Sequence, residues 1–143
     1  MSGESHAETA RRALEEVCSG RDLDALPDVY HPDFVDHVNA LEYRGHEGAR
    51  RSVALYMALF PDLRFNVDEQ VTEGERVASR WTLDGTHRGR RVRLTGIVIS
   101  RFQDGCIIED HAASDTMELI RQLGLWRTIL LLLRYPRLVF NRG

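Results

Sequence analysis

Cysteine, proline and uninterrupted apolar runs are scarce in this sequence, and each scarcity excludes a class of protein. The two cysteines, Cys18 and Cys106, lie far apart and in no metal-binding spacing, so we expect free thiols in a reducing compartment. The four prolines are scattered, and no Pro/Gly/Ser-rich linker or internal repeat divides the 143 residues. Arginines and a proline interrupt the apolar C-terminal stretch, which therefore does not predict a membrane-spanning helix.

Neither sign of charge dominates, because 19 basic and 22 acidic residues are mixed along the chain and give a formal charge of −3. A nucleic-acid partner would require a basic stripe, so we exclude one. Apolar residues at 43% and charged residues at 29% are typical of a soluble globular domain. The polar start, Ser2 to His6, lacks the apolar core of a signal peptide, and we expect a cytoplasmic location.

Helical periodicity dominates the first half of the chain. Residues 7–18 carry apolar side chains at helical spacing and predict a helix that Gly20 ends. Asp22 can cap a short second helix over 23–30, and an extended segment begins at residues 34–38. Residues 46–60 then predict a third helix before Pro61.

The period then changes to two, which predicts strands over residues 63–72, 77–87, 92–102 and 106–113. Asp115 can cap a final helix, and Gly124 ends it. Helices followed by an antiparallel meander indicate an α+β fold over residues 1–124, with an apolar extension over 125–143. A strongly curved sheet wrapped around a helix would form a cone whose open mouth leads to a small-molecule cavity.

The last predicted strand carries Glu109 and His111, and Asp115 follows it, all at odd-numbered positions. In a regular strand such positions share one face of the sheet. If that face lines the cavity, these acidic and imidazole groups could transfer protons.

Four segments, taken in order, resemble the SnoaL-like polyketide cyclases of the NTF2-like (cone-shaped α+β barrel) superfamily. They are Tyr30-His-Pro-Asp-Phe-Val-Asp-His37, Gly45-His-Glu-Gly48, Gly85-Thr-His-Arg-Gly89, and Arg101-Phe-Gln-Asp-Gly105 continued by Glu109, Asp115 and Gln122-Leu-Gly124. The resemblance covers roughly residues 8 to 124 and implies an NTF2-like cone. It leaves the activity open, because this fold hosts isomerases, dehydratases, cyclases, oxygenases and binding modules.

The resemblance also suggests roles for three residues. In the cyclases, the aspartate before the final helix is the general acid/base, and Asp115 stands at that position. His111 replaces the tryptophan that is usual in the family, and Arg101 stands where some cyclases have a histidine. Cofactor-free hydroxylases of aromatic polyketides share the scaffold, and a pocket of Arg, Asp and His is similar to that branch.

Each candidate also has a purely structural interpretation. Asp115 is an evident helix N-cap with Glu118 three residues later, and His111 and Arg101 could be exposed strand residues. A wider set of residues is expected to bind the substrate: His37, His87, Tyr56, Trp81 and Glu109. The two histidines could equally be ordinary residues at the edge of the sheet.

No His-x-His or His-x-x-x-His pair is present, so the spacing predicts no metal site and we expect no cofactor. The leading hypothesis is abstraction of an acidic C–H from a hydrophobic, polyketide-like carbonyl compound by Asp115, with His111 or Arg101 stabilising the enolate before an aldol ring closure. Oxygen-dependent hydroxylation and ligand binding or dimerisation without turnover are the alternatives. The extension 125–143 could pack against the domain's own sheet or against a second subunit in a homodimer, form a lid, or touch a membrane surface.

Overall fold

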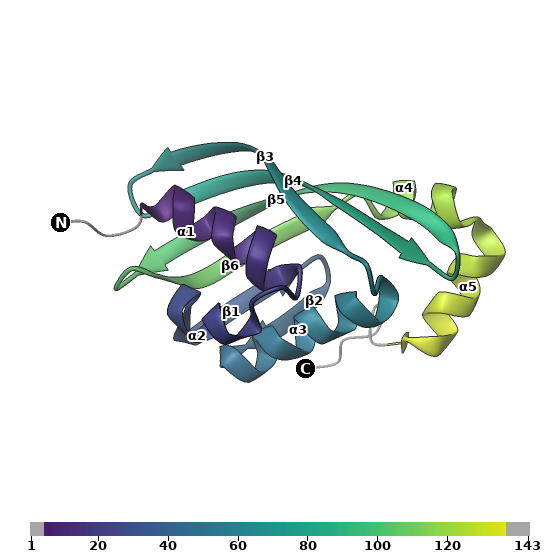
Figure 1. Cartoon of the computed structure of the whole chain (residues 1–143), viewed down its shortest axis with the longest axis horizontal. Helices are drawn as coiled ribbons and strands as arrows, with labels where there is room; N and C mark the ends of the chain where they lie inside the picture. Colours follow the sequence, from purple (N-terminus) through teal and green to yellow (C-terminus); the bar gives the residue numbers. More distant parts are fainter. Residues whose placement is uncertain (1–4, 137–143) are drawn as a thin grey trace.

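A six-stranded mixed sheet curves around the N-terminal helices without closing into a barrel (Figure 1). The structure is a computed structural model that describes residues 5–136. The strand order is β2-β1-β6-β5-β4-β3, in which β1 and β6 are parallel and the other neighbours are antiparallel. The α+β prediction is confirmed.

The first predicted helix is present, with a wider second half. Helix α1 (His6–Arg12) begins with a capping box between Ser5 and Glu8, and continues as a π-helical segment over Ala13–Cys18. Gly20 ends it with a φ of 70°, a conformation open to glycine at little cost. The helix thereby presents Ala10, Ala13 and Val17 to the core.

The segment after this helix holds the extended stretch expected at 34–38 and, after it, a short strand that the sequence pattern did not predict. A 3₁₀ turn (Leu23–Ala25) and α2 (Leu26–Val29) precede β1 (Tyr30–Val38), which turns back as β2 (Leu41–Arg44). Because β2 has only four residues at the sheet edge, its period of two is too short to be recognised. Helix α3 (Gly45–Leu59) then follows as predicted.

The meander of the second half is confirmed. Its strands are β3 (Arg64–Glu73), β4 (Arg76–His87), β5 (Arg90–Gln103) and β6 (Cys106–Ser114). Gly74, Gly89 and Gly105, all at positive φ, make the connecting turns.

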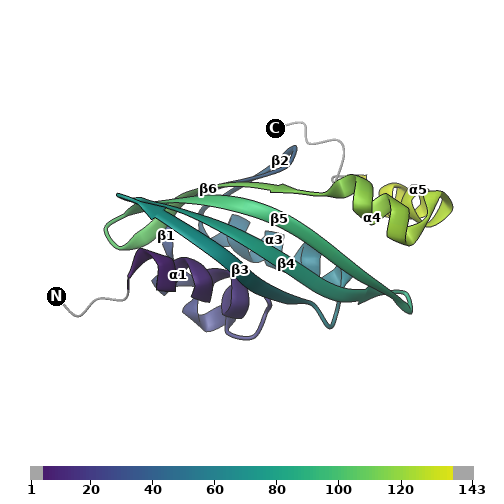
Figure 2. The same cartoon turned by 90° about the horizontal axis from the view of Figure 1, so that it is seen from above.

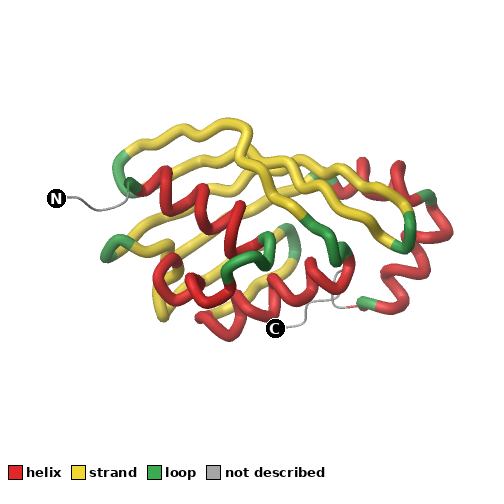
Figure 3. Tube along the Cα trace, viewed as in Figure 1, coloured by secondary structure: helices red, strands yellow, loops and turns green. Residues whose placement is uncertain are grey.

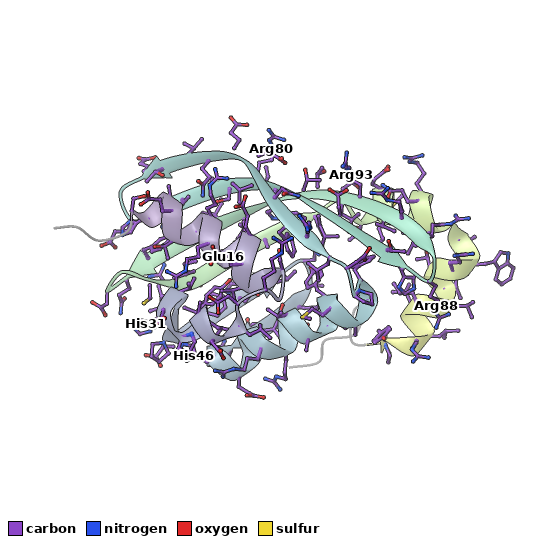
Figure 4. The ribbon with its side chains drawn as sticks, viewed as in Figure 1. Glu16, His31, His46, Arg80, Arg88 and Arg93 are labelled. Atoms are coloured by element: carbon purple, nitrogen blue, oxygen red, sulfur yellow. The ribbon has the colours of Figure 1, made fainter. Side chains whose placement is uncertain are left out.

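The helices cover the concave face of the sheet (Figure 3). Helix α1 packs against β3 and β4, and α3 packs against β1 and β2. We call the opposite, convex face of the sheet the outer face. Charged pairs lie on it, including Arg80 with Asp68 and Arg93 with Asp84, and Figure 4 shows both arginines pointing away from the helices.

The chain ends in two short helices beyond the sheet (Figure 2). Helix α4 (Thr116–Leu123) and helix α5 (Leu125–Arg134) meet at Gly124, whose φ is 81°. The first part of the predicted extension is therefore helical, and residues 137–143 lie outside the described part. Within residues 5–136 no helix has the length and apolar character needed to cross a membrane.

Candidate functional site

A cavity lies between the concave face of the sheet and the helices α1 and α3. Its wall is mostly apolar and includes Leu14, Val53, Phe65 and Val98. The volume within which the centre of a water molecule fits is about 60 Å³. The cavity is small beside the pockets that hold drug-sized ligands, so a polycyclic ligand requires side chains of the wall to move.

Two aspartates stand side by side in this apolar wall. Asp36 of β1 and Asp110 of β6 are register partners in the parallel pair, and both line the cavity. Asp110 is buried, whereas Asp36 keeps part of its surface accessible. Two carboxyl groups so placed cannot both ionise at low cost, because each charge repels the other and neither is fully hydrated.

The environment of Asp110 favours its protonated form. Burial raises its pKa to about 7, although the Ser100 hydroxyl bonded to its carboxyl opposes that rise. Its Oδ1 atom is buried without a hydrogen-bond partner. Burial and, secondarily, the neighbouring Asp110 raise the pKa of Asp36 well above its usual value. The pair therefore holds at least one proton at neutral pH.

Neutral hydroxyl and thiol groups surround the pair. Cys18 and Tyr30 contact each other at 3.4 Å between sulfur and hydroxyl oxygen, and Tyr56 lines the same cavity. Burial raises the pKa of Cys18 to about 12 and the pKa values of both tyrosines well above their usual range. These groups stay protonated at physiological pH and can donate hydrogen bonds to a bound oxygen atom.

Two of the residues predicted from the sequence lie in this cavity. Tyr56 and Trp81 form part of its wall, and Phe65 lies between them with edge-on ring contacts to both. Both side chains therefore face the cavity, and substrate binding by them stays a prediction.

Glu109 and His111 lie on the same face of β6, as predicted, but that face is the outer face of the sheet. Glu109 Oε2 lies 3.7 Å from His111 Nε2, and Arg101 pairs with Glu109 Oε1 at 3.3 Å. His37 joins them, with Nε2 3.2 Å from Glu109 Oε2. None of these four side chains lines the cavity, and the prediction that they do is wrong.

A β-bulge explains the error. The register moves from Phe102↔Ile107 to Arg101↔Glu109, which leaves Ile108 as an extra residue in β6. Ile107 faces the core, so in a regular strand Glu109 and His111 would face it too. The extra residue reverses the alternation and turns Asp110 inward instead.

Asp115 is a helix cap. Its carboxylate accepts a hydrogen bond from the Glu118 backbone N–H at 3.0 Å, and the residue is exposed rather than placed in the cavity. The structural interpretation from the sequence is confirmed, and the expected pocket position is wrong, because the chain has left the sheet at this point to begin α4.

His87 also lies away from the cavity. It is buried at the end of β4, where Nδ1 donates a hydrogen bond to the Leu59 carbonyl at 2.8 Å and the ring contacts Phe60 edge-on. The side chain fastens β4 to the end of α3, and its predicted position in the pocket is wrong.

Sequence reasoning missed both aspartates, although a signal was present for one of them. Asp36 shares its parity with Phe34 and Val38, two apolar residues of the same strand. An acidic residue in an apolar row is the pattern of a buried functional carboxyl. Asp110 gave no such signal, because the bulge next to it cannot be read from the sequence.

A strongly curved, open sheet wrapped around helices, with polar groups gathered in its concave cavity, defines the NTF2-like class of α+β proteins. Residues 8–123 match the family described as SnoaL-like polyketide cyclase. The chain belongs to this family, as the resemblance from its motifs implied. No functionally curated protein matches the chain.

Solved structures agree with this assignment. A loop-truncation variant of IdmH is 31% identical, with a TM-score of 0.74 over 84% of this chain and 100% of that chain. Wild-type IdmH of Streptomyces antibioticus, a proposed polyketide cyclase, is 28% identical, with a TM-score of 0.75 over 85% and 99%. AclR of Streptomyces galilaeus, a proposed hydroxylase, is 26% identical, with a TM-score of 0.67 over 85% and 98%.

Proposed function

We propose that this protein is an acid/base enzyme that abstracts an acidic C–H from a hydrophobic, polyketide-like carbonyl compound and closes a ring by an aldol step. The observation that carries the proposal is the Asp36–Asp110 pair in an apolar cavity. A pair that holds one proton near neutral pH offers a base and an acid in the same site. Family membership and the similarity to IdmH support the substrate class.

The pKa directions favour one division of roles. Asp110, with a pKa of about 7 and an unpartnered oxygen, is suited to accept the substrate proton. Asp36, whose pKa is raised well above its usual value, then donates a hydrogen bond to the enolate oxygen and a proton to the alkoxide formed on ring closure. The apolar wall excludes water and strengthens both interactions.

Substitution of the pair separates this proposal from the role that the family motif suggests for Asp115. Aromatic β-ketoesters incubated in D₂O report C–H abstraction by loss of the proton signal in NMR. Asp110→Asn should slow this exchange by about 10²- to 10⁴-fold, the usual contribution of a general base. Asp115→Asn, which retains the cap, should leave the rate within about twofold of wild type.

Circular dichroism establishes that both variants are folded. If Asp110→Asn exchanges the proton as fast as the wild type, the assignment to the buried pair is wrong. If only Asp115→Asn loses the exchange, Asp115 is the general base, as the resemblance implied.

Hydroxylation is the second candidate, and the similarity to AclR favours it. The same deprotonation would generate a carbanion that adds to molecular oxygen, and an external two-electron reductant such as a thiol would convert the resulting hydroperoxide to the alcohol and water. Oxygen consumption together with a gain in product mass distinguishes hydroxylation from ring closure, which changes neither.

A further inference from the structure

The outer face of the sheet carries a cluster of metal-ligating side chains that the proposed reaction does not use. His37 of β1 and Glu109 and His111 of β6 each offer one ligand atom, and these three atoms lie within 4.8 Å of one another. We propose that His37, Glu109 and His111 form a binding site for a divalent metal of the Zn²⁺ class. The cluster lies on the opposite side of the sheet from the cavity, because consecutive residues of a strand face opposite ways.

The separations fit a tetrahedral ion. Two ligands each about 2.0 to 2.2 Å from zinc lie about 3.4 Å apart in this geometry. Glu109 Oε2 lies 3.2 Å from His37 Nε2 and 3.7 Å from His111 Nε2. The imidazole rings of the two histidines are stacked, with centroids 4.4 Å apart, so the exposed His111 side chain has to turn for its nitrogen to point at the ion.

The charged neighbours fix the ligand atoms in place. Glu42 Oε2 lies 3.4 Å from His37 Nδ1, which directs Nε2 of the same ring toward Glu109. Arg101 pairs with the other oxygen of Glu109, Oε1, so that Oε2 faces the two histidines. A carboxylate behind a ligating histidine is the usual outer-sphere partner at zinc sites.

The pairing of β1 with β6 creates this arrangement. His37 and His111 are register partners, one position after Asp36 and Asp110. They are 74 positions apart in the sequence, so no spacing rule reveals them and the sequence predicted no metal site. Three protein ligands and an accessible side facing solvent leave a fourth position for water, the open form of a zinc site.

Calorimetric titration of the full chain with ZnCl₂ tests the proposal, together with the visible absorption of Co²⁺ added in place of zinc. We expect the wild type to show one saturable site. Bound Co²⁺ should give intense visible absorption bands, which indicate a four-coordinate ion. His37→Asn combined with His111→Asn should abolish both signals, and Glu42→Gln should weaken binding by about 10- to 100-fold. His31→Asn removes one imidazole from β1 outside the cluster and should bind zinc like the wild type.

The double histidine variant keeps both cysteines, so it also controls for binding by thiols. Zinc that binds the double variant as tightly as the wild type would overturn the proposal, as would a wild type without saturable 1:1 binding. Thermal denaturation adds a second readout, because zinc should raise the Tm of the wild type and not that of the double variant. Neither measurement depends on the proton-transfer activity, so this site and the cavity succeed or fail separately.

Discussion

At the scale of single residues, Asp110 is a buried ionisable carboxyl. The free-energy cost of burying it depends on pH. The pKa of the folded carboxyl is about 7, whereas an unfolded aspartate has a pKa near 3.8. Between these values the folded protein binds more protons than the unfolded chain. Stability therefore falls as the pH rises from about 4 to about 7, and the loss is complete above that window.

We predict that Asp110→Asn removes the part of the pH dependence that Asp110 contributes, while Asp36, whose pKa burial also raises, keeps its own part. A difference of about three pKa units corresponds to about 4 kcal/mol. Between pH 4 and pH 8, the free energy of unfolding of the wild type should therefore fall by about 4 kcal/mol more than that of Asp110→Asn. Urea denaturation at both pH values measures it, and equal pH profiles for the two proteins would contradict the raised pKa.

Glu109 shows the opposite behaviour on the outer face of the same strand. Its hydrogen bond to His37 and, after that, its contacts with Arg101 lower its pKa. Neighbouring residues of one strand thus hold carboxyl groups shifted in opposite directions, because one faces an apolar cavity and the other faces cationic partners.

At the scale of elements, the indole of Trp81 on β4 lies over Gly96 on the neighbouring strand β5 and leaves room there for glycine alone. A Cβ atom added at Gly96 would collide with the Trp81 indole and would lie 2.6 Å from the Ala113 carbonyl oxygen. Trp81 is part of the cavity wall, so the glycine lets the indole lie across the sheet and close that side of the site.

We predict that Gly96→Ala lowers the free energy of unfolding by about 1 to 3 kcal/mol and displaces Trp81. Urea denaturation gives the first quantity, and a shift in tryptophan emission reports the second. Gly74→Asn is the matched control, because nothing lies within 4 Å of its Cβ and asparagine tolerates the φ of 57°. If Gly96→Ala is as stable as the wild type, the prediction is wrong, because the indole then moves without a cost in free energy.

At the scale of the whole molecule, helix α5 leaves a large apolar surface exposed. Thr128 and Leu131 are its buried residues, while Trp126 is 79% exposed and Leu133 is 73% exposed. Monomeric proteins rarely expose a contiguous apolar patch of this kind. We therefore expect a second copy of the chain to cover it, as the sequence suggested for residues 125–143.

We predict a homodimer in solution that Leu130→Glu combined with Leu133→Glu converts to a folded monomer. Gel filtration with light scattering measures the mass of each protein. Arg127→Glu changes the charge of the same helix without altering its apolar residues and should remain dimeric. A wild type that elutes as a monomer at micromolar concentration would contradict the prediction.

Sequence alone determined the α+β class, the turns and the order of most elements, because periodicity, caps and glycines act over a few neighbouring residues. It also identified Asp115 as a candidate helix cap, and two of its candidate substrate-binding residues, Tyr56 and Trp81, line the cavity. Only the tertiary structure decided which carboxyls face the cavity. The parallel pairing of β1 with β6 joins segments more than 70 residues apart, and no local pattern encodes such contacts. The extra residue Ile108 lies within the β5–β6 hairpin, where the sequence alternation gives no sign of it.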